Sequence, residues 1–427
     1  MILNNSLDFR TQALKSVGLG ILVASIFASS GCGNGASPGT FANPTNGTTL
    51  PPLSGPNVLQ LTVNGSLCTI EYPDKPCVSV TVCAAGSTTN CQTISDILLD
   101  TGSFGLRVFG SVLNSAVLAG LTPVTVGGQA IAECTQYGDG SSDWGPVELA
   151  NVILGTESPV QAPIQIIDST YSNSSLYCSG ADQNPAQAGY NGILGVGFFT
   201  QDCGPICTTQ ANNGNYFACT GSTCSSSTVP LANQVQNPVS LLPIDNNGVI
   251  VELPTVPSGG QASANGYLVL GIGTESNNTP SGVTAYTAAQ QTAANAGNFT
   301  STVNGTSYSS FLDSGSNGIF FPSALVNLYS NCGTTISADS GWYCPSSTQT
   351  MQATNIGISG GPSIGVQIQI ANFVSLMNTG NNVFFNNGGS LGGGAVDWGL
   401  PFFIGRNVYV GFQGMASSLG TGPYWAY

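Results

Sequence analysis

Residues 98–108 are LLDTGSFGLRV, and residues 311–320 are FLDSGSNGIF. In both stretches an apolar run leads to one aspartate, Asp100 or Asp313, that opens an Asp-Thr-Gly-Ser or Asp-Ser-Gly-Ser turn. A pattern that occurs twice at this distance indicates an internal duplication rather than a solenoid, whose repeats are shorter. Two acids that each end an apolar strand predict one site built from two halves.

Each half also contains a later apolar run that ends in glycine. These runs are GILGVG at 192–197 and LPFFIG at 400–405. Gly195 follows Asp100 by 95 residues, and Gly405 follows Asp313 by 92 residues. We therefore expect Gly195 and Gly405 at equivalent places, each on a strand that supports the aspartate of its half.

The composition favours β-structure and excludes several classes of function. Only 6% of the residues are charged and 41% are hydrophobic, and the 57 glycines favour strands joined by tight turns. Beyond the first 31 residues the cations are Lys75, Arg107 and Arg406, which are too few for a nucleic-acid surface. The chain has no histidine, which excludes Ser-His-Asp catalysis and histidine-bound zinc. We expect no metal and no cofactor, and a protein that tolerates acid because few cations repel one another at low pH.

The N-terminal segment has the features of an export signal. Arg10 and Lys15 precede an apolar stretch at 17–27, and small residues then lead to Cys32. We predict a signal peptide at 1–31 and a lipid on Cys32 as the membrane anchor, with a plain secretory signal as the alternative. Residues 32–56 are rich in small and polar residues and would form a flexible tether. The predicted location is the periplasmic side of the outer membrane or the cell surface.

The remaining twelve cysteines predict disulfides. Their number is even once Cys32 is reserved for lipid, and no histidine is available to share a metal site with them. Three local pairs are expected, namely Cys68–Cys77, Cys83–Cys91 and Cys332–Cys344. The pairing of the other six stays open. Four of these six lie in residues 200–229, which we expect to form a surface excursion.

A hairpin is predicted between the first aspartate and the first apolar-Gly run. Residues 131–136 lead into Tyr137-Gly138-Asp139-Gly140-Ser141, which has the turn chemistry of a hairpin tip, and residues 147–154 form the return strand. On its own, Tyr137 is explained as an aromatic side chain that packs on a strand.

Taken in order, these elements resemble the pepsin-like aspartic peptidases over about residues 57–427. The resemblance rests on the two aspartate turns, the hairpin tip, Gly192–Gly195 and Phe403–Gly405. The stretch LVLGIG at 268–273 is similar to the family's entry to its second lobe. The resemblance implies an all-β, bilobal fold with a cleft between two pseudo-symmetric lobes, at 57–260 and 261–427. It also implies an exported, lipoprotein-type aspartic endopeptidase that acts as a monomer on a peptide or protein substrate.

In this family Asp100 and Asp313 would be the catalytic pair. Two adjacent carboxyls share a proton, so one can act as general base on a water while the other donates to the substrate carbonyl. From the hairpin, Tyr137 and Gly138 would cover the bound substrate. The other turn residues would brace the two loops, hydrogen-bond the carboxyls or permit close approach, and they are Thr101 and Ser314, Ser103 and Ser316, Gly102 and Gly315.

Two arginines depart from the family pattern. Arg107 stands where an aromatic residue usually lies near the substrate; there it would favour the ionised form of the pair, and the alternative is an arginine paired with a nearby carboxylate. Arg406 stands where an aspartate commonly follows the second apolar-Gly. Arg107 and the cysteine-rich segment motivate a second hypothesis, a catalytically inactive pepsin-like lipoprotein that binds or inhibits. A passive surface protein is the third hypothesis, and for both aspartates the alternative is an ordinary turn residue.

Overall fold

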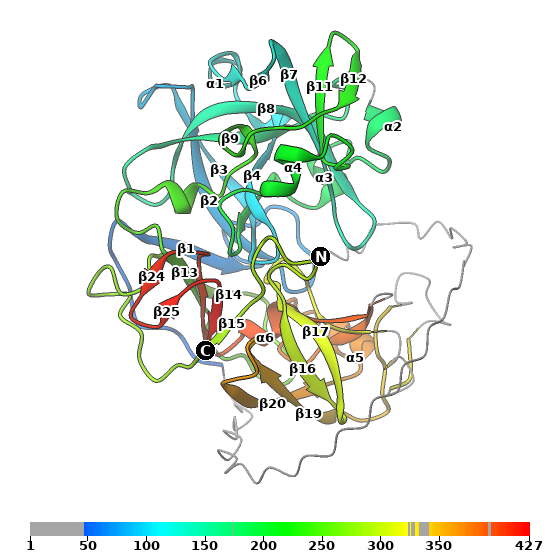
Figure 1. The fold of residues 1–427 in the computed structure, drawn as a ribbon. Helices are drawn as coiled ribbons and strands as arrows, with labels where there is room; N and C mark the ends of the chain where they lie inside the picture. The colour runs from blue at the N-terminus through cyan, green and yellow to red at the C-terminus, as the bar shows by residue number, and fades with distance from the viewer. Residues whose placement is uncertain (1–46, 173, 323–324, 326–328, 333–340, 392–393) are drawn as a thin grey trace.

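The computed structural model describes residues 47–427 except 173, 323–324, 326–328, 333–340 and 392–393 (Figure 1). The predicted signal peptide, Cys32 and most of the predicted tether lie outside the described residues. As predicted, the described chain is all-β, and each of its α-helices has five residues or fewer. The helices are α1 (Ser115–Ala119), α2 (Ser174–Tyr177), α3 (Pro185–Ala188), α4 (Pro205–Thr209), α5 (Phe373–Met377) and α6 (Leu400–Phe403).

The first aspartate ends a central strand of the first half. That strand, β3 (Cys91–Asp100), is followed by β4 (Phe104–Phe109). Between them lies β10 (Gly192–Val196), parallel to β3 and antiparallel to β4, while β4 also pairs in parallel with β9 (Val160–Ile167). All of β10 is buried, as expected for an apolar strand with neighbours on both sides. Gly195 lies beside Asp100 in this register.

The second half repeats this arrangement. Here β17 (Thr306–Leu312) leads to Asp313, and β18 (Ile319–Pro322) follows the turn. Between them lies β22 (Ala395–Trp398), parallel to β17 and antiparallel to β18, while β18 also pairs in parallel with β21 (Gly388–Leu391). The internal duplication predicted from the two turns is confirmed by this strand pairing.

One element of the duplication was predicted at the wrong place. The strand beside Asp313 is β22, and the glycine that follows it is Gly399, whereas residues 400–403 form α6. Pro401 explains the difference, because proline has no N–H for a central strand but fits the first turn of a helix. Gly405 therefore does not correspond to Gly195, and Arg406 does not follow the second apolar-Gly.

Strands from both halves also pair with one another in the large sheet that contains β3, β4 and β10. Its strand β1 (Val58–Val63) pairs with β14 (Ala264–Leu270), and β14 pairs with β13 (Gly248–Glu252). Next to β13 lies β23 (Asn407–Gly411), which pairs with the C-terminal strand β26 (Tyr424–Ala426). The predicted boundary at 260/261 thus falls between β13 and β14, two neighbours in one sheet.

The predicted hairpin is present and has an unexpected neighbour. Its strands are β7 (Gln129–Gln136) and β8 (Ser142–Ile153), and β7 also pairs with β11 (Tyr216–Thr220). Since β11 and its partner β12 (Thr223–Ser226) belong to residues 200–229, this segment extends the hairpin sheet and is not merely a surface excursion. The remaining strands are β2 (Pro76–Cys83), β5 (Thr122–Pro123), β6 (Thr125–Val126), β15 (Ala285–Thr287), β16 (Phe299–Val303), β19 (Gln349–Ile356), β20 (Ser363–Ile370), β24 (Ala416–Ser417) and β25 (Gly420–Thr421).

All twelve described cysteines are paired. The three predicted disulfides are confirmed, and the others are Cys134–Cys178, Cys203–Cys207 and Cys219–Cys224. Six disulfides indicate a protein of an oxidising compartment, extracellular or periplasmic. Within the described residues, none of the helices has the length and apolar character needed to span a bilayer.

Candidate active site

The two aspartate turns lie directly against each other. A Cβ added to Gly102 would come within 2.6 Å of Asp313 Cγ, and one added to Gly315 within 2.9 Å of Asp100 Cγ. Each turn therefore approaches the opposite carboxyl more closely than a residue with a side chain would permit. Asp100 and Asp313 are only 4% and 3% exposed. The structure thus brings together the two acids that the sequence places 213 residues apart.

Reciprocal hydrogen bonds brace the two turns, as the resemblance implies. Thr101 Oγ1 donates to the Leu312 carbonyl (3.0 Å) and accepts from the Ser314 backbone N–H (2.9 Å). In return Ser314 Oγ donates to the Leu99 carbonyl (2.7 Å) and accepts from the Thr101 N–H (3.1 Å). Because each hydroxyl satisfies two buried backbone groups of the opposite turn, the brace fixes the relative position of the two acids.

We expect Thr101→Val to lower the free energy of unfolding by about 2 kcal/mol, because it leaves two buried backbone groups without a partner. Thr101→Ser keeps the hydroxyl and is the matched control, with an expected loss below about 1 kcal/mol. Urea unfolding followed by circular dichroism measures both variants. Equal stability of the Val and Ser variants would contradict the role given to the hydroxyl.

The two carboxyls differ in their hydrogen bonds. Asp100 Oδ1 accepts from the Gly102 N–H (2.7 Å), and Asp313 Oδ1 accepts from the Gly315 N–H (2.9 Å). Ser316 Oγ lies 3.0 Å from Asp313 Oδ2. The corresponding Ser103 Oγ is near enough to Asp100 to contribute a hydrogen bond that lowers the pKa of Asp100, as predicted, but its geometry is poorer than that of Ser316 with Asp313.

The proximity of the two carboxyls couples their proton binding. Burial, and then the negative charge of Asp313, raise the pKa of Asp100 to about 7. Burial acts in the same direction on Asp313, but hydrogen bonds with Asp100 and Ser316 contribute to lowering its pKa. The two groups titrate as a pair, and between their transitions the pair holds one proton. The raised pKa of Asp100 favours Asp100 as the carrier of that proton.

The hairpin tip carries Tyr137 close to the pair. The Tyr137 hydroxyl donates to Asp143 Oδ2 (2.7 Å), and Tyr190 donates to the same oxygen (3.3 Å). Burial raises the pKa of Tyr137, and negative charge on Asp143 and on Asp100 adds to the increase. Tyr137 also packs against an apolar cluster that includes Leu98, as the simpler interpretation expected. Gly138 is exposed at the tip.

Arg107 is not an open substrate-binding cation. It is 1% exposed, and its guanidinium forms ion pairs with Glu133 (2.7 Å) and Asp202 (3.1 Å). Burial works against the positive charge, but Glu133 holds the pKa of Arg107 above its usual value. The same pairing holds the pKa of Glu133 below its usual value in spite of burial, while burial and Glu133 raise that of Asp202. The alternative interpretation, an arginine paired with carboxylates, is confirmed.

Sequence reasoning missed two residues of this region. Tyr72 is 3% exposed and its hydroxyl has no hydrogen-bond partner among the described residues. Burial raises the pKa of Tyr72, and Asp100 and Asp313 contribute smaller increases, so its ring lies within electrostatic reach of both acids. No motif marks Tyr72. The second residue is Asp397, and here a signal existed, namely a lone acid in the apolar run of β22.

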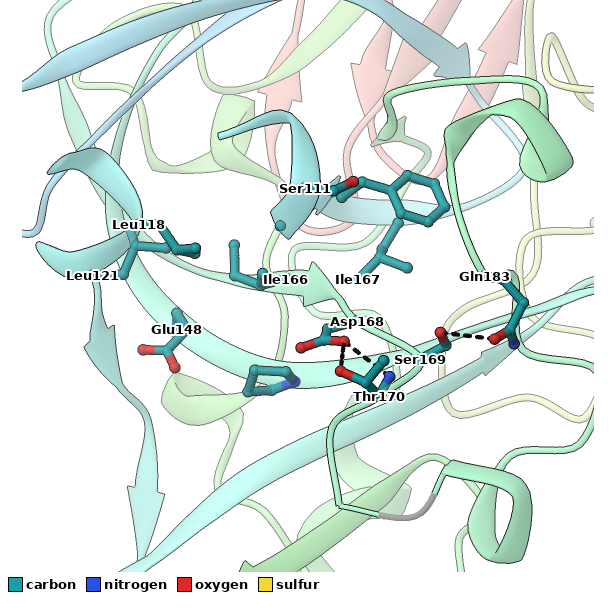
Figure 2. A pocket seen from close by; sticks show the side chains of 13 residues that line it. Ser111, Leu118, Leu121, Glu148, Ile166, Ile167, Asp168, Ser169, Thr170 and Gln183 are labelled. Atoms are coloured by element: carbon teal, nitrogen blue, oxygen red, sulfur yellow. Dashed lines mark hydrogen bonds between the residues drawn. The ribbon is translucent and has the colours of Figure 1, made fainter. Parts of the chain in front are cut away.

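A separate pocket of about 450 Å³ lies between η1 (Gly110–Val112), β8 and β9. Figure 2 shows Glu148 and Asp168 in this pocket together with apolar side chains such as Ile166. Its lining includes neither Asp100 nor Asp313, so it is not the site of the paired acids. One group of possible metal ligands, Cys68, Cys77 and Asp96, is also unsuitable, since its two sulfurs form a disulfide.

The buried acids predict how stability depends on pH. Burial raises the pKa of Asp143 to about 6, of Asp100 to about 7 and of Asp182 to about 8. The folded chain therefore binds protons that the unfolded chain, with carboxyl pKa values near 4, releases. We expect the free energy of unfolding to increase as the pH falls from about 8 to about 4.5. Urea midpoints at the two pH values test this, and a lower midpoint at pH 4.5 would contradict it.

Comparison with known proteins gives a family but no activity. Residues 54–427 match a family described as "Protein of unknown function (DUF3443)". No curated protein matches the chain.

Proposed function

We propose that this chain, which belongs to the DUF3443 family, is an exported aspartic endopeptidase with a bilobal pepsin-like fold that activates water between Asp100 and Asp313. One observation carries the proposal. Two acids from duplicated strand-turn units are held together by reciprocal braces, each facing the glycine of the opposite turn. Two ordinary turn aspartates need neither the duplication nor the braces.

The proposed reaction begins with Asp313 ionised and Asp100 protonated. Asp313 takes a proton from water as the water oxygen attacks the peptide carbonyl carbon, and Asp100 gives its proton to the carbonyl oxygen. The C–N bond of the resulting diol then breaks. The leaving amine takes the proton from Asp313, and a diol hydroxyl returns a proton to Asp100. Tyr137 and Gly138 at the hairpin tip would cover the peptide and exclude water.

The proposal includes location and partners. The six disulfides support export, and we propose that Cys32 carries the lipid that holds the protein at the periplasmic face of the outer membrane or at the cell surface. The partner is a peptide or an unfolded protein segment in extended conformation, bound by a monomer. Neither nucleic acid nor a cofactor takes part.

Both features that motivated the hypothesis of an inactive binding protein have a structural explanation. Arg107 is committed to Glu133 and Asp202, and it forms no ion pair with Asp100 or Asp313 in the described part of the chain. The cysteine-rich segment has a structural role, since β11 extends the hairpin sheet and Tyr216 donates to Asp202 (2.7 Å).

The test is cleavage of an unfolded protein substrate between pH 3 and pH 8, with fragments identified by mass spectrometry. We expect internal cleavage, sensitive to a pepstatin-like inhibitor. It should be lost on the alkaline side near pH 7, where Asp100 gives up its proton. Folded protein that cuts nothing at any pH in this range would overturn the proposal.

A further inference from the structure

A third carboxyl lies behind the pair. Ser316 Oγ, 3.0 Å from Asp313 Oδ2, is also 2.7 Å from Asp397 Oδ2. Asp397 lies on β22, and its side chain is 0% exposed. One hydroxyl therefore connects Asp397 to the acid that the proposed reaction uses as its base.

Ser316 lies between Asp313 and Asp397, and the number of protons available for its two contacts requires that one of these two acids is protonated. A serine hydroxyl has one proton to donate, yet Ser316 Oγ lies at hydrogen-bond distance from two carboxyl oxygens, one of Asp313 and one of Asp397. If Asp313 and Asp397 were both ionised, one of the two contacts would set two oxygen acceptors against each other without a proton. A protonated Asp397 solves this, because it donates to Ser316 Oγ and Ser316 then donates to Asp313.

The surroundings place the proton on Asp397 rather than on Asp313. Asp313 Oδ1 accepts from the backbone N–H groups of Gly315 (2.9 Å) and Ser316 (3.3 Å), which favour a negative charge. Asp397 Oδ1 has no hydrogen-bond partner among the described residues, and Asp397 forms none of the ion pairs found there. A buried carboxylate with one partner and no cation is costly, so the neutral form is favoured.

The first half offers an internal comparison. In β10 the position that corresponds to Asp397 is Ile193, since each pairs with the residue two before the aspartate of its half. Ile193 is buried and cannot donate a hydrogen bond, so the first half has no carboxyl at the place that Asp397 occupies in the second. The chain of hydrogen bonds is thus confined to the second half, which gives the two acids different surroundings.

We propose that Asp397 is a positioning residue that stays protonated and, through Ser316, directs a hydrogen bond to Asp313, so that Asp313 is the base and Asp100 the acid. The proposal deepens the proposed peptidase function and rests on it for the roles of the two acids. The ionisable groups around Asp397 are Asp313 at the end of β17 and Asp100 at the end of β3. The strand on its other side, β18, carries none.

Native electrophoresis at neutral pH tests the protonation of Asp397 without any activity. Asp397→Asn has the same size and also a donor, and it should co-migrate with the wild type because no charge is lost. Glu275→Gln changes an exposed carboxylate and is the control that shows the shift of one charge. If Asp397→Asn shifts as far as Glu275→Gln, Asp397 is ionised and the proposal fails. Should the Asn variant not fold, Asp397→Leu is judged by the same comparison.

The pH profile of cleavage tests the effect on the pair. Asp397→Asn should leave the acid limb of kcat/KM in place, whereas Asp397→Leu, which removes the donor, should move it to higher pH by about half a unit. If Asp397 were ionised in the wild type, Asp397→Asn would remove a negative charge near Asp313. The acid limb of the Asn variant would then move to lower pH by about one unit. An acid limb that moves in the Asn variant, or stays in place in the Leu variant, contradicts the proposal. If no variant and no wild type cleaves, the proposed function fails, and electrophoresis still decides the protonation of Asp397.

Discussion

Asp100→Asn is expected to lower kcat/KM for peptide cleavage at acidic pH by about 10³-fold, the range of a lost general acid or base. The amide has the size of the carboxyl and can still accept from the Gly102 N–H, so the turn keeps its shape. It cannot, however, give up and regain a proton at the substrate carbonyl. Asp313→Asn should cost as much, because the two groups act as a unit and neither works alone. A fluorogenic peptide measures both rates.

Glu275→Gln is the matched control for these variants. It makes the same chemical change at an exposed acid far from the turns in sequence, and its rate should equal that of the wild type. Circular dichroism and urea midpoints establish that the three variants are folded. An Asp100→Asn or Asp313→Asn variant that is folded and cleaves at the wild-type rate would remove both acids from the mechanism.

Arg107→Met is expected to lower the free energy of unfolding by about 3–5 kcal/mol, because it leaves buried carboxylates without their cation. The side chains of Glu133 and Asp202, beside the guanidinium, are 0% and 6% exposed. Since the pKa of Glu133 is below its usual value, its contribution is present at neutral pH and is lost as the pH falls through the folded pKa. The loss in the Met variant should therefore be larger at pH 7 than at pH 3. Urea unfolding at the two pH values measures it.

The double variant Arg107→Met, Glu133→Gln separates the ion pair from the packing. It removes the stranded charge of Glu133 along with the cation, so it should recover much of the lost stability. If Arg107→Met instead keeps its urea midpoint and loses only activity, the arginine acts on the substrate, and the buried-cluster account is wrong.

Local chemistry allowed part of this structure to be predicted. Asp100 and Asp313 end apolar strands and enter turns whose glycines permit close approach, and these features are visible in a few consecutive residues. The disulfide Cys83–Cys91 flanks one hairpin, so its partners are near each other in sequence as well as in space. The tip at Tyr137–Ser141 is likewise set by turn chemistry.

The remaining features depend on contacts between distant segments. Phe403–Gly405 has the composition of a supporting strand but does not form one. The supporting strand of the second half, β22, ends before Gly399, and Pro401 was the sign in the sequence that a helix follows. Arg107 on β4 meets Glu133 on β7 and Asp202, which are distant in sequence, so its own neighbourhood in the sequence does not reveal these partners. Asp397 was visible as an acid in an apolar run, but its link to Ser316 depends on the duplication placing β22 beside β17.

Cleavage in ¹⁸O-labelled water tests the central claim most directly. The folded wild type at acidic pH should release peptides whose new C-terminal carboxyl carries one ¹⁸O atom, because the water activated between Asp100 and Asp313 attacks the carbonyl. Mass spectrometry should find no such products from Asp100→Asn or Asp313→Asn. Labelled products at undiminished yield from either variant, or none from the wild type between pH 3 and pH 8, would contradict the account.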